Sequence, residues 1–280
     1  MSDIVIPVAK KNLIPTIQPK QAKQVTFTVG SAKVAKRILY HGQPGCCKTT
    51  FGAFSPKPLF ITTLSEDGLN TLMDYGLVPD NIPYVNVKTW PELIDVLNSL
   101  HTRDNSDTET LVIDTINGVQ DMLVKHVMGT KFGNDPIKFN QWGEGEKSCL
   151  AEWMNLINGT IEKIRVELKL RIILLSHCEQ VKQKNHAGGA EYYQLAPMSL
   201  RKLANAIESY PDFMIFANRP SIVEDKAKRE VGRAPLELRF NDGGGYMAKN
   251  RANLPDSVVV RGDQPADVWG TFYDLLKGKV

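Results

Sequence analysis

The chain has 280 residues, of which 42% are hydrophobic, and a formal net charge of +3. This length and composition suit one large α/β domain or two small ones. No apolar stretch has the length of a membrane span, the first thirty residues lack a signal-peptide core, and the four cysteines form neither a disulfide framework nor a zinc spacing. We therefore expect a cytoplasmic protein with reduced thiols.

The N-terminal part of the chain differs from the rest in composition. Residues 1–23 contain three prolines and no sustained hydrophobic period, which predicts an extended arm that needs a partner for order. Residues 1–60 carry nine lysine or arginine residues and one acidic residue. Such a basic end occurs in arms that meet nucleic acid or an acidic subunit, and equally in solvated tails. We predict that the folded domain comprises residues 24–280.

Strands and helices alternate from residue 24 onward. Strands are predicted at residues 25–29, 37–41, 59–63, 84–87, 110–114, 171–176 and 212–217. Helices are predicted at residues 48–54, 67–75, 91–100, 117–128, 146–170, 198–209 and 266–277. Residues 180–197 are predicted to be a long polar loop, and residues 236–249 a β-hairpin around a glycine-rich turn. The alternation predicts an α/β fold with a mostly parallel sheet covered by helices.

The segment between the strand at 37–41 and the helix at 48–54 is nearly a phosphate-binding loop. It consists of Gly42, Gln43, Pro44, Gly45, Cys46, Cys47, Lys48 and Thr49, and Thr50 follows. In such a loop backbone N–H groups wrap the phosphates, a lysine reaches the β and γ oxygens, and a hydroxyl binds Mg²⁺. Lys48 and Thr49 are predicted to take the last two roles. Cys47 stands where the pattern has its second glycine, so a side chain must fit where backbone usually approaches the ligand.

Three polar residues follow predicted parallel strands and are expected at the same edge of the sheet. Asp114 ends the strand at 110–114 and can hold the Mg²⁺ shell opposite the loop threonine. Glu66 can polarise an attacking water; the alternative is an acidic residue that the helix dipole favours. His177 is placed to touch the γ-phosphate; the alternative is a hydrogen-bonded loop histidine. Together with the loop they predict a nucleotide site.

The order of these parts resembles the RecA-like P-loop ATPase core over about residues 36–260. The parts are the phosphate-binding loop, Glu66, Asp114, His177, a long loop, and a hairpin that ends in Lys249, Asn250 and Arg251. Within that group the chain is similar to phage-encoded AAA-type nucleotide-binding proteins of single-strand annealing and recombination. The resemblance implies a twisted sheet, assembly into rings or filaments, ATP bound between subunits, and location in the host cytoplasm.

The resemblance also implies a role for each matching residue. Lys48 would bind phosphate, and Thr49 and Asp114 would bind Mg²⁺. Glu66 would be the catalytic glutamate and His177 the switch residue. Lys249 and Arg251 match a Lys-x-Arg pair that related proteins insert into the neighbouring subunit's site, where cations neutralise charge on the transferred phosphoryl group. The alternative for this pair is a solvated position after a hairpin.

Two segments are the candidates for contact with single-stranded DNA. The first, residues 131–142, contains Lys131, Lys138 and aromatic residues. The second contains Lys182, Lys184, Tyr192 and Tyr193. Basic groups follow phosphates and aromatic rings stack on bases, although aromatic residues in such segments also serve as packing anchors. A single-strand-binding protein is a further expected partner.

We predict a Mg²⁺-dependent, oligomeric ATPase that acts on single-stranded DNA in phage recombination or annealing. A ring helicase or helicase loader is the nearest alternative. A DNA-binding assembly protein with negligible turnover is another, and Cys47 favours it. A small-molecule kinase is disfavoured because no arginine-rich lid is visible.

The adjacent thiols of Cys46 and Cys47 give one further prediction. They lie at a predicted helix N-terminus beside Lys48, a setting that lowers a thiol pKa. We expect both to be reactive and to be shielded by bound nucleotide; the alternative is two small residues that happen to fit.

Overall fold

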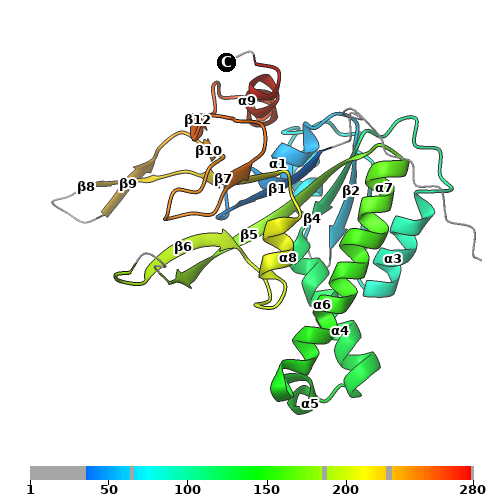
Figure 1. Ribbon diagram of the computed structural model, residues 1–280. Helices are drawn as coiled ribbons and strands as arrows, with labels where there is room; N and C mark the ends of the chain where they lie inside the picture. Colours follow the sequence, from blue (N-terminus) through cyan, green and yellow to red (C-terminus); the bar gives the residue numbers. More distant parts are fainter. Residues whose placement is uncertain (1–35, 64–65, 185–187, 225–228, 279–280) are drawn as a thin grey trace, which may run out of the picture. The chain divides into compact units, whose positions relative to one another are not determined.

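The computed structural model describes residues 36–63, 66–184, 188–224 and 229–278 (Figure 1). These residues belong to one compact unit. The predicted arm and the predicted strand at 25–29 lie outside the described residues, so both stay predictions. No helix within the described ranges combines the length and the apolarity that crossing a membrane requires.

The centre of the described part is a mixed sheet of ten strands. Along its main path the order is β12-β10-β7-β1-β5-β4-β2-β3. Six strands run parallel to one another: β1 (Arg37–Gly42), β2 (Pro58–Thr63), β3 (Tyr84–Val87), β4 (Thr110–Asp114), β5 (Arg171–Gln183) and β7 (Phe213–Asn218). Each was predicted from its apolar run, because strands buried on both faces need apolar residues at successive positions.

Alternate residues of the strands feed two separate hydrophobic clusters, one on each face of the sheet. On β5, Ile172 and Leu174 belong to one cluster, and Ile173 and Leu175 belong to the other. The first cluster includes residues of α3 (Trp90–Ser99), α4 (Ile116–Phe132), α6 (Glu144–Met154) and α7 (Glu162–Glu167). The second includes residues of α1 (Lys48–Ala53), α2 (Gly68–Asp74) and α9 (Asp267–Leu276). The sheet is therefore covered by helices on both faces, as predicted.

Local sequence signals set several helix ends. The Thr89 hydroxyl accepts a hydrogen bond from the Glu92 N–H and begins α3. The Thr115 hydroxyl accepts one from the Gly118 N–H and begins α4 directly after β4. A Cβ atom at Gly118 would lie 2.0 Å from the Thr63 hydroxyl, so only glycine lets α4 begin this close to β2. The start of α4 is thereby fixed at the carboxyl edge of the sheet.

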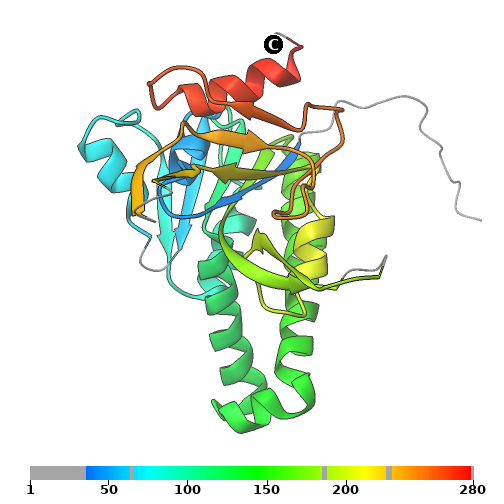
Figure 2. The same ribbon diagram turned by 90° about the vertical axis from the view of Figure 1, so that its left-hand side faces the viewer.

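The predicted DNA-contact loop at residues 131–142 is helical instead. Helix α4 continues to Phe132, α5 spans Pro136–Asn140, and the 3₁₀-helix η1 spans Gln141–Gly143. The π-helix η2 (Asn155–Ile161) joins α6 to α7, which confirms the predicted long helical stretch. Figure 2 shows α4 and α6 extending side by side beyond the sheet. We call α4, η1, α5 and α6 the spur; Ile137 and Trp142 near its tip are 80% and 84% exposed.

The predicted polar loop at 180–197 is also wrong, because it contains a two-stranded arm. Strand β5 continues past the sheet to Gln183 and pairs antiparallel with β6 (Tyr192–Pro197). We call this pair the β5–β6 hairpin (Figure 1). It carries few apolar residues because its outer part has no core to pack against, so the usual strand signal is missing. Helix α8 (Ala204–Ser209) begins later than predicted.

The C-terminal strands pair differently from the predicted hairpin. Strands β10 (Glu237–Arg239) and β11 (Lys249–Asn250) each pair antiparallel with β7, and β12 (Ser257–Val259) pairs with β10. The ring of Tyr246 stacks on Phe216 of β7 with ring centroids 5.2 Å apart, which holds the connecting segment against β7. Two further strands, β8 (Ser221–Glu224) and β9 (Arg229–Arg233), form a hairpin that was not predicted.

Candidate functional site

The predicted phosphate-binding loop connects β1 to α1 at the carboxyl edge of the parallel strands. A Cβ atom at Gly42 would lie 2.5 Å from the Ala217 carbonyl oxygen, so this position requires glycine. The buried Tyr40 hydroxyl donates a hydrogen bond of 2.8 Å to the Cys46 carbonyl oxygen. These contacts fix the loop against the sheet, while Gln43, Pro44 and Gly45 remain exposed.

Cys47 adopts the left-handed conformation, with φ +56° and ψ +35°, immediately before α1. This conformation favours glycine, and a residue with a Cβ atom pays roughly 1–2 kcal/mol for it. The backbone of the loop therefore retains the geometry that the second glycine of the pattern serves, although the residue has changed. Cys47 in place of glycine therefore costs conformational energy but does not change the backbone path of the loop.

Lys48 and Thr49 lie where the pattern predicts. The Lys48 ammonium donates hydrogen bonds to the carbonyl oxygens of Gly42 and Gln43, each 3.1 Å long, and burial lowers its pKa. The Thr49 hydroxyl donates a bond of 2.7 Å to Asp114 Oδ2. Asp114 is buried at the end of β4, and this burial raises its pKa to about 6. Loop and carboxylate are thus in direct contact although 65 residues separate them in the chain.

Glu66 and His177 form a second pair at the same edge of the sheet. The His177 Nε2 atom lies 3.3 Å from Glu66 Oε1, and the Thr115 hydroxyl donates to the same oxygen at 3.4 Å. The hydrogen bond with His177 is the main cause that lowers the pKa of Glu66. His177 stands opposite Gly42 in the β1–β5 register, so the pair lies beside the loop.

The chemistry of these residues fits a magnesium nucleotide. The described residues contain no cluster of three or more His, Cys, Asp or Glu side chains able to hold a metal by themselves. Mg²⁺ in nucleotide sites takes one or two protein oxygens and completes its shell with phosphate and water. Thr49 and Asp114 supply such oxygens, and Lys48 with the loop N–H groups supplies donors to phosphate.

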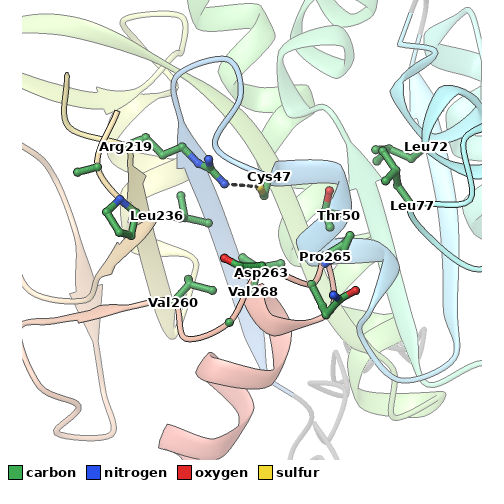
Figure 3. A pocket seen from close by; sticks show the side chains of 14 residues that line it. Cys47, Thr50, Leu72, Leu77, Arg219, Leu236, Val260, Asp263, Pro265 and Val268 are labelled. Carbon is green, nitrogen blue, oxygen red and sulfur yellow. Dashed lines mark hydrogen bonds between the residues drawn. The ribbon is translucent and has the colours of Figure 1, made fainter. Parts of the chain in front are cut away.

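A cavity of about 580 Å³ opens beside the loop (Figure 3). Cys47 of the loop and Thr50 of α1 are among the residues that line it. Its other lining residues are Leu72, Leu77, Arg219, Ala234, Pro235, Leu236, Val260, Gly262, Asp263, Gln264, Pro265 and Val268. Both apolar surface and a few polar groups line it, as in sites for organic ligands. Apart from Cys47 and Thr50, sequence reasoning identified none of these residues, because they come from segments whose neighbours in space depend on the strand order.

Lys249 and Arg251 lie away from the candidate nucleotide site. In register, Lys249 stands opposite Met214, and Met214 stands opposite Leu39, so the pair lies toward the amino ends of the parallel strands. The Lys249 ammonium donates to the Glu208 carbonyl oxygen at 2.6 Å. Arg251 forms an ion pair of 3.0 Å with Asp212. The loop lies at the other ends of these strands.

The candidate DNA-contact residues lie on two separate projections. On the spur, Lys131 pairs with Glu152 at 3.0 Å and Lys138 pairs with Asp135 at 3.5 Å. On the β5–β6 hairpin, Lys182 pairs with Glu191, whereas Lys184 is exposed. The side chains of Tyr192 and Tyr193 on the hairpin are exposed as well.

The prediction of two activated thiols is wrong for Cys46. Its side chain is buried, and this burial raises the pKa of the thiol. Cys47 is partly exposed and lines the cavity, with the Arg219 Nη2 atom 3.7 Å from its Sγ. Only the second of the adjacent thiols is therefore accessible.

The parallel sheet, the loop and the acidic residues beside it define a P-loop NTPase of the α/β class. Comparison with known families gives a match to the AAA domain over residues 35–252. This match contains β1 through β11 and all of the loop, so the chain belongs to the AAA domain family. No curated protein matches the chain. Family and geometry together support binding and hydrolysis of a nucleotide.

Proposed function

We propose that the protein is a Mg²⁺-dependent ATPase that works as a homo-oligomer on single-stranded DNA in phage recombination or strand annealing. The observation that carries the ATPase part is the meeting of two pairs, Thr49 with Asp114 and Glu66 with His177, at the edge where the loop lies. Phosphoryl transfer to water requires that the residues for phosphate, Mg²⁺ and the attacking water lie together, and here they meet at one edge of the sheet.

Each residue of the site has a distinct part in this proposal. Lys48 would bind the β and γ oxygens of the nucleotide, and Thr49 and Asp114 would hold Mg²⁺, which would neutralise phosphate charge. Glu66 orients and polarises the attacking water. Its hydrogen bond with His177 lowers its pKa, so Glu66 stays ionised at neutral pH and its carboxylate can accept a hydrogen bond from the water.

The β5–β6 hairpin is the proposed contact for single-stranded DNA. It continues the strand that carries His177, so a ligand on the hairpin has a direct connection to the nucleotide edge. Tyr192 and Tyr193 offer exposed rings for stacking on bases, and Lys184 offers a cation for phosphate. Lysines on both projections have carboxylate partners, Lys131 and Lys138 on the spur and Lys182 on the hairpin, so the exposed tyrosine pair and the connection to His177 favour the hairpin.

Assembly into a ring or filament would give Lys249 and Arg251 a role in a neighbouring site. Neither reaches the loop of its own subunit, since both lie toward the opposite edge of the sheet. The Arg251 side chain is 56% exposed, so another subunit can reach it. A cation supplied in this way by a neighbour raises the rate of phosphoryl transfer by about 10³-fold or more in related chemistry.

Steady-state ATP hydrolysis with Mg²⁺, with and without single-stranded DNA, tests the proposal. The wild type should hydrolyse ATP faster with DNA than without it. Lys48→Ala should show only the background rate, and Glu66→Gln should bind ATP without turnover. Wild-type activity equal to that of Lys48→Ala would contradict the ATPase proposal. An unchanged rate with DNA would contradict its DNA part.

Mixing two inactive variants tests the oligomer. Lys48→Ala has a defective loop but keeps Lys249 and Arg251. Arg251→Ala has an intact loop but lacks the arginine. A mixture should regain activity because some interfaces combine an intact loop with an intact arginine. Activity of Arg251→Ala equal to that of wild type, or no recovery in the mixture, would contradict a role in the neighbouring site.

A second function has one observation in its favour, the left-handed Cys47 in the phosphate-binding loop. In this alternative the nucleotide is a structural ligand of a DNA-binding assembly protein with negligible turnover. Tight ATP binding by calorimetry, together with turnover no faster than that of Glu66→Gln, would favour this function over the ATPase.

A further inference from the structure

Arg219 follows β7 directly and lies beside the phosphate-binding loop (Figure 3). The register explains its place, because Ala217 of β7 stands opposite Gly42 of β1, where the loop begins. A residue two positions after Ala217 must then lie at the carboxyl edge of the sheet. Arg219 reaches across this edge, and its Nη2 atom lies 3.7 Å from Cys47 Sγ.

The charge of Arg219 is not neutralised by any ion pair that the described residues form. Arg37, Arg239 and Arg251 lie near carboxylates at 2.7–3.0 Å, whereas the contact of Arg219 is with a sulfur atom. Its side chain is exposed and lines the cavity of about 580 Å³. An arginine in such a place suits an anionic ligand, because its planar donors match phosphate oxygens.

The cavity lining indicates which part of a nucleotide Arg219 faces. Among the described residues, Cys47 and Thr50 line the cavity. The residues assigned to Mg²⁺, the γ-phosphate and the attacking water do not line it; they are Lys48, Thr49, Glu66 and Asp114. Arg219 therefore lies on the side of the loop away from the phosphate that is cleaved, where the cavity has room for a nucleoside.

We propose that Arg219 binds the α-phosphate of the nucleotide held by its own subunit and orients the nucleoside in the cavity. The guanidinium adds affinity at the end of the nucleotide that stays unchanged in hydrolysis, so it takes no part in phosphoryl transfer. This inference rests on the proposed nucleotide site. It differs from the roles of Lys249 and Arg251, which require a second subunit.

Calorimetric titration of the full chain with ATP, ADP and adenosine tests the inference. In Arg219→Ala the Kd for ATP and for ADP should each rise about tenfold, the typical loss for one charge-assisted hydrogen bond. The Kd for adenosine and the kcat for ATP should not change, while KM rises. Arg219→Lys should recover part of the affinity, because it keeps the charge but not the planar donors. Arg103→Ala, which removes an exposed arginine from the α3–β4 connection, is the matched control.

The possible results separate this inference from the proposed function. A loss confined to ATP would place Arg219 at the γ-phosphate and overturn the inference, and so would an equal loss for adenosine or no loss at all. Each of these results leaves the wild-type nucleotide site intact. If the wild type binds neither ATP nor ADP, the proposed function fails, and the inference fails with it.

Discussion

The side chain of Asn117 accepts a hydrogen bond of 2.8 Å from the backbone N–H of His177. The same side chain donates a bond of 2.8 Å to the carbonyl oxygen of Met198, which follows β6. Met198 in turn donates its N–H to the His177 carbonyl oxygen. Asn117 in the first turn of α4 therefore connects the base of the β5–β6 hairpin to the nucleotide edge, and Gln120 of the same helix adds a bond of 3.3 Å to the Met198 carbonyl oxygen.

Removal of this link should separate DNA binding from ATP turnover. In Asn117→Ala we expect retained basal hydrolysis and a loss of most stimulation by single-stranded DNA, because the hairpin root loses two hydrogen bonds to α4. Turnover with and without DNA is the primary measurement, and faster hydrogen exchange in β6 should accompany the loss. Asn98→Ala, on the exposed face of α3, is the control. Full stimulation in Asn117→Ala would contradict this link.

Replacement of the buried Asp114 carboxyl by a neutral amide should make the fold more stable. Burial raises its pKa to about 6, so above this pH the folded protein must ionise the group at a cost that the unfolded chain does not have. At pH 8 Asp114→Asn should gain roughly 1–3 kcal/mol in the free energy of unfolding. The gain should shrink as the pH falls through 6 and vanish near pH 4.

Urea unfolding at several pH values measures this gain, and ATP titration with Mg²⁺ provides the functional comparison. Asp114→Asn should lose the Mg²⁺ dependence of binding while it gains stability. A gain that persists at pH 4 would mean that packing, and not ionisation, is its cause.

Replacement of Cys47 by glycine should relieve the loop. Glycine adopts the left-handed conformation without a steric cost, although it also adds freedom to the unfolded chain. We expect a net gain of about 0.5–1 kcal/mol in stability and faster ATP turnover. Cys47→Ala is the matched control because it removes the sulfur and keeps the Cβ atom. Equal stability in both variants would show that the thiol, and not the backbone conformation, matters.

Alkylation should discriminate between the adjacent thiols. Cys47 is partly exposed, whereas Cys46 is buried and has a raised pKa, so iodoacetamide should modify Cys47 first. ATP should slow this modification because Cys47 lines the cavity. Peptide mass spectrometry after timed quenching gives both rates. Modification of Cys46 at the rate of Cys47 would contradict the buried position of its thiol.

The sequence predicted the parts of the fold that depend on apolar runs. The parallel strands are buried on both faces, so their composition identifies them and the polar residues that follow them. This is why Asp114, Glu66 and His177 were predicted at one edge, and why the structure places them together. The phosphate-binding loop was predictable for a similar reason, since its residues are contiguous.

Other features depend on information that a single sequence does not carry. The place of Arg219 follows from β7 lying next to β1, and strand order is a tertiary property. The β5–β6 hairpin lacks an apolar face. In the spur, residues 131–142 were predicted as a loop, whereas Gly133 caps the C-terminus of α4 and Pro136 begins α5.

The exposed tip of the spur gives the protein a built-in optical reporter. Of the four tryptophans, Trp90, Trp153 and Trp269 are buried, and Trp142 is 84% exposed. A soluble quencher such as acrylamide will therefore act on Trp142 before the others. A change in the quenched fraction during assembly or ligand binding reports whether this end of the molecule becomes covered, without any label.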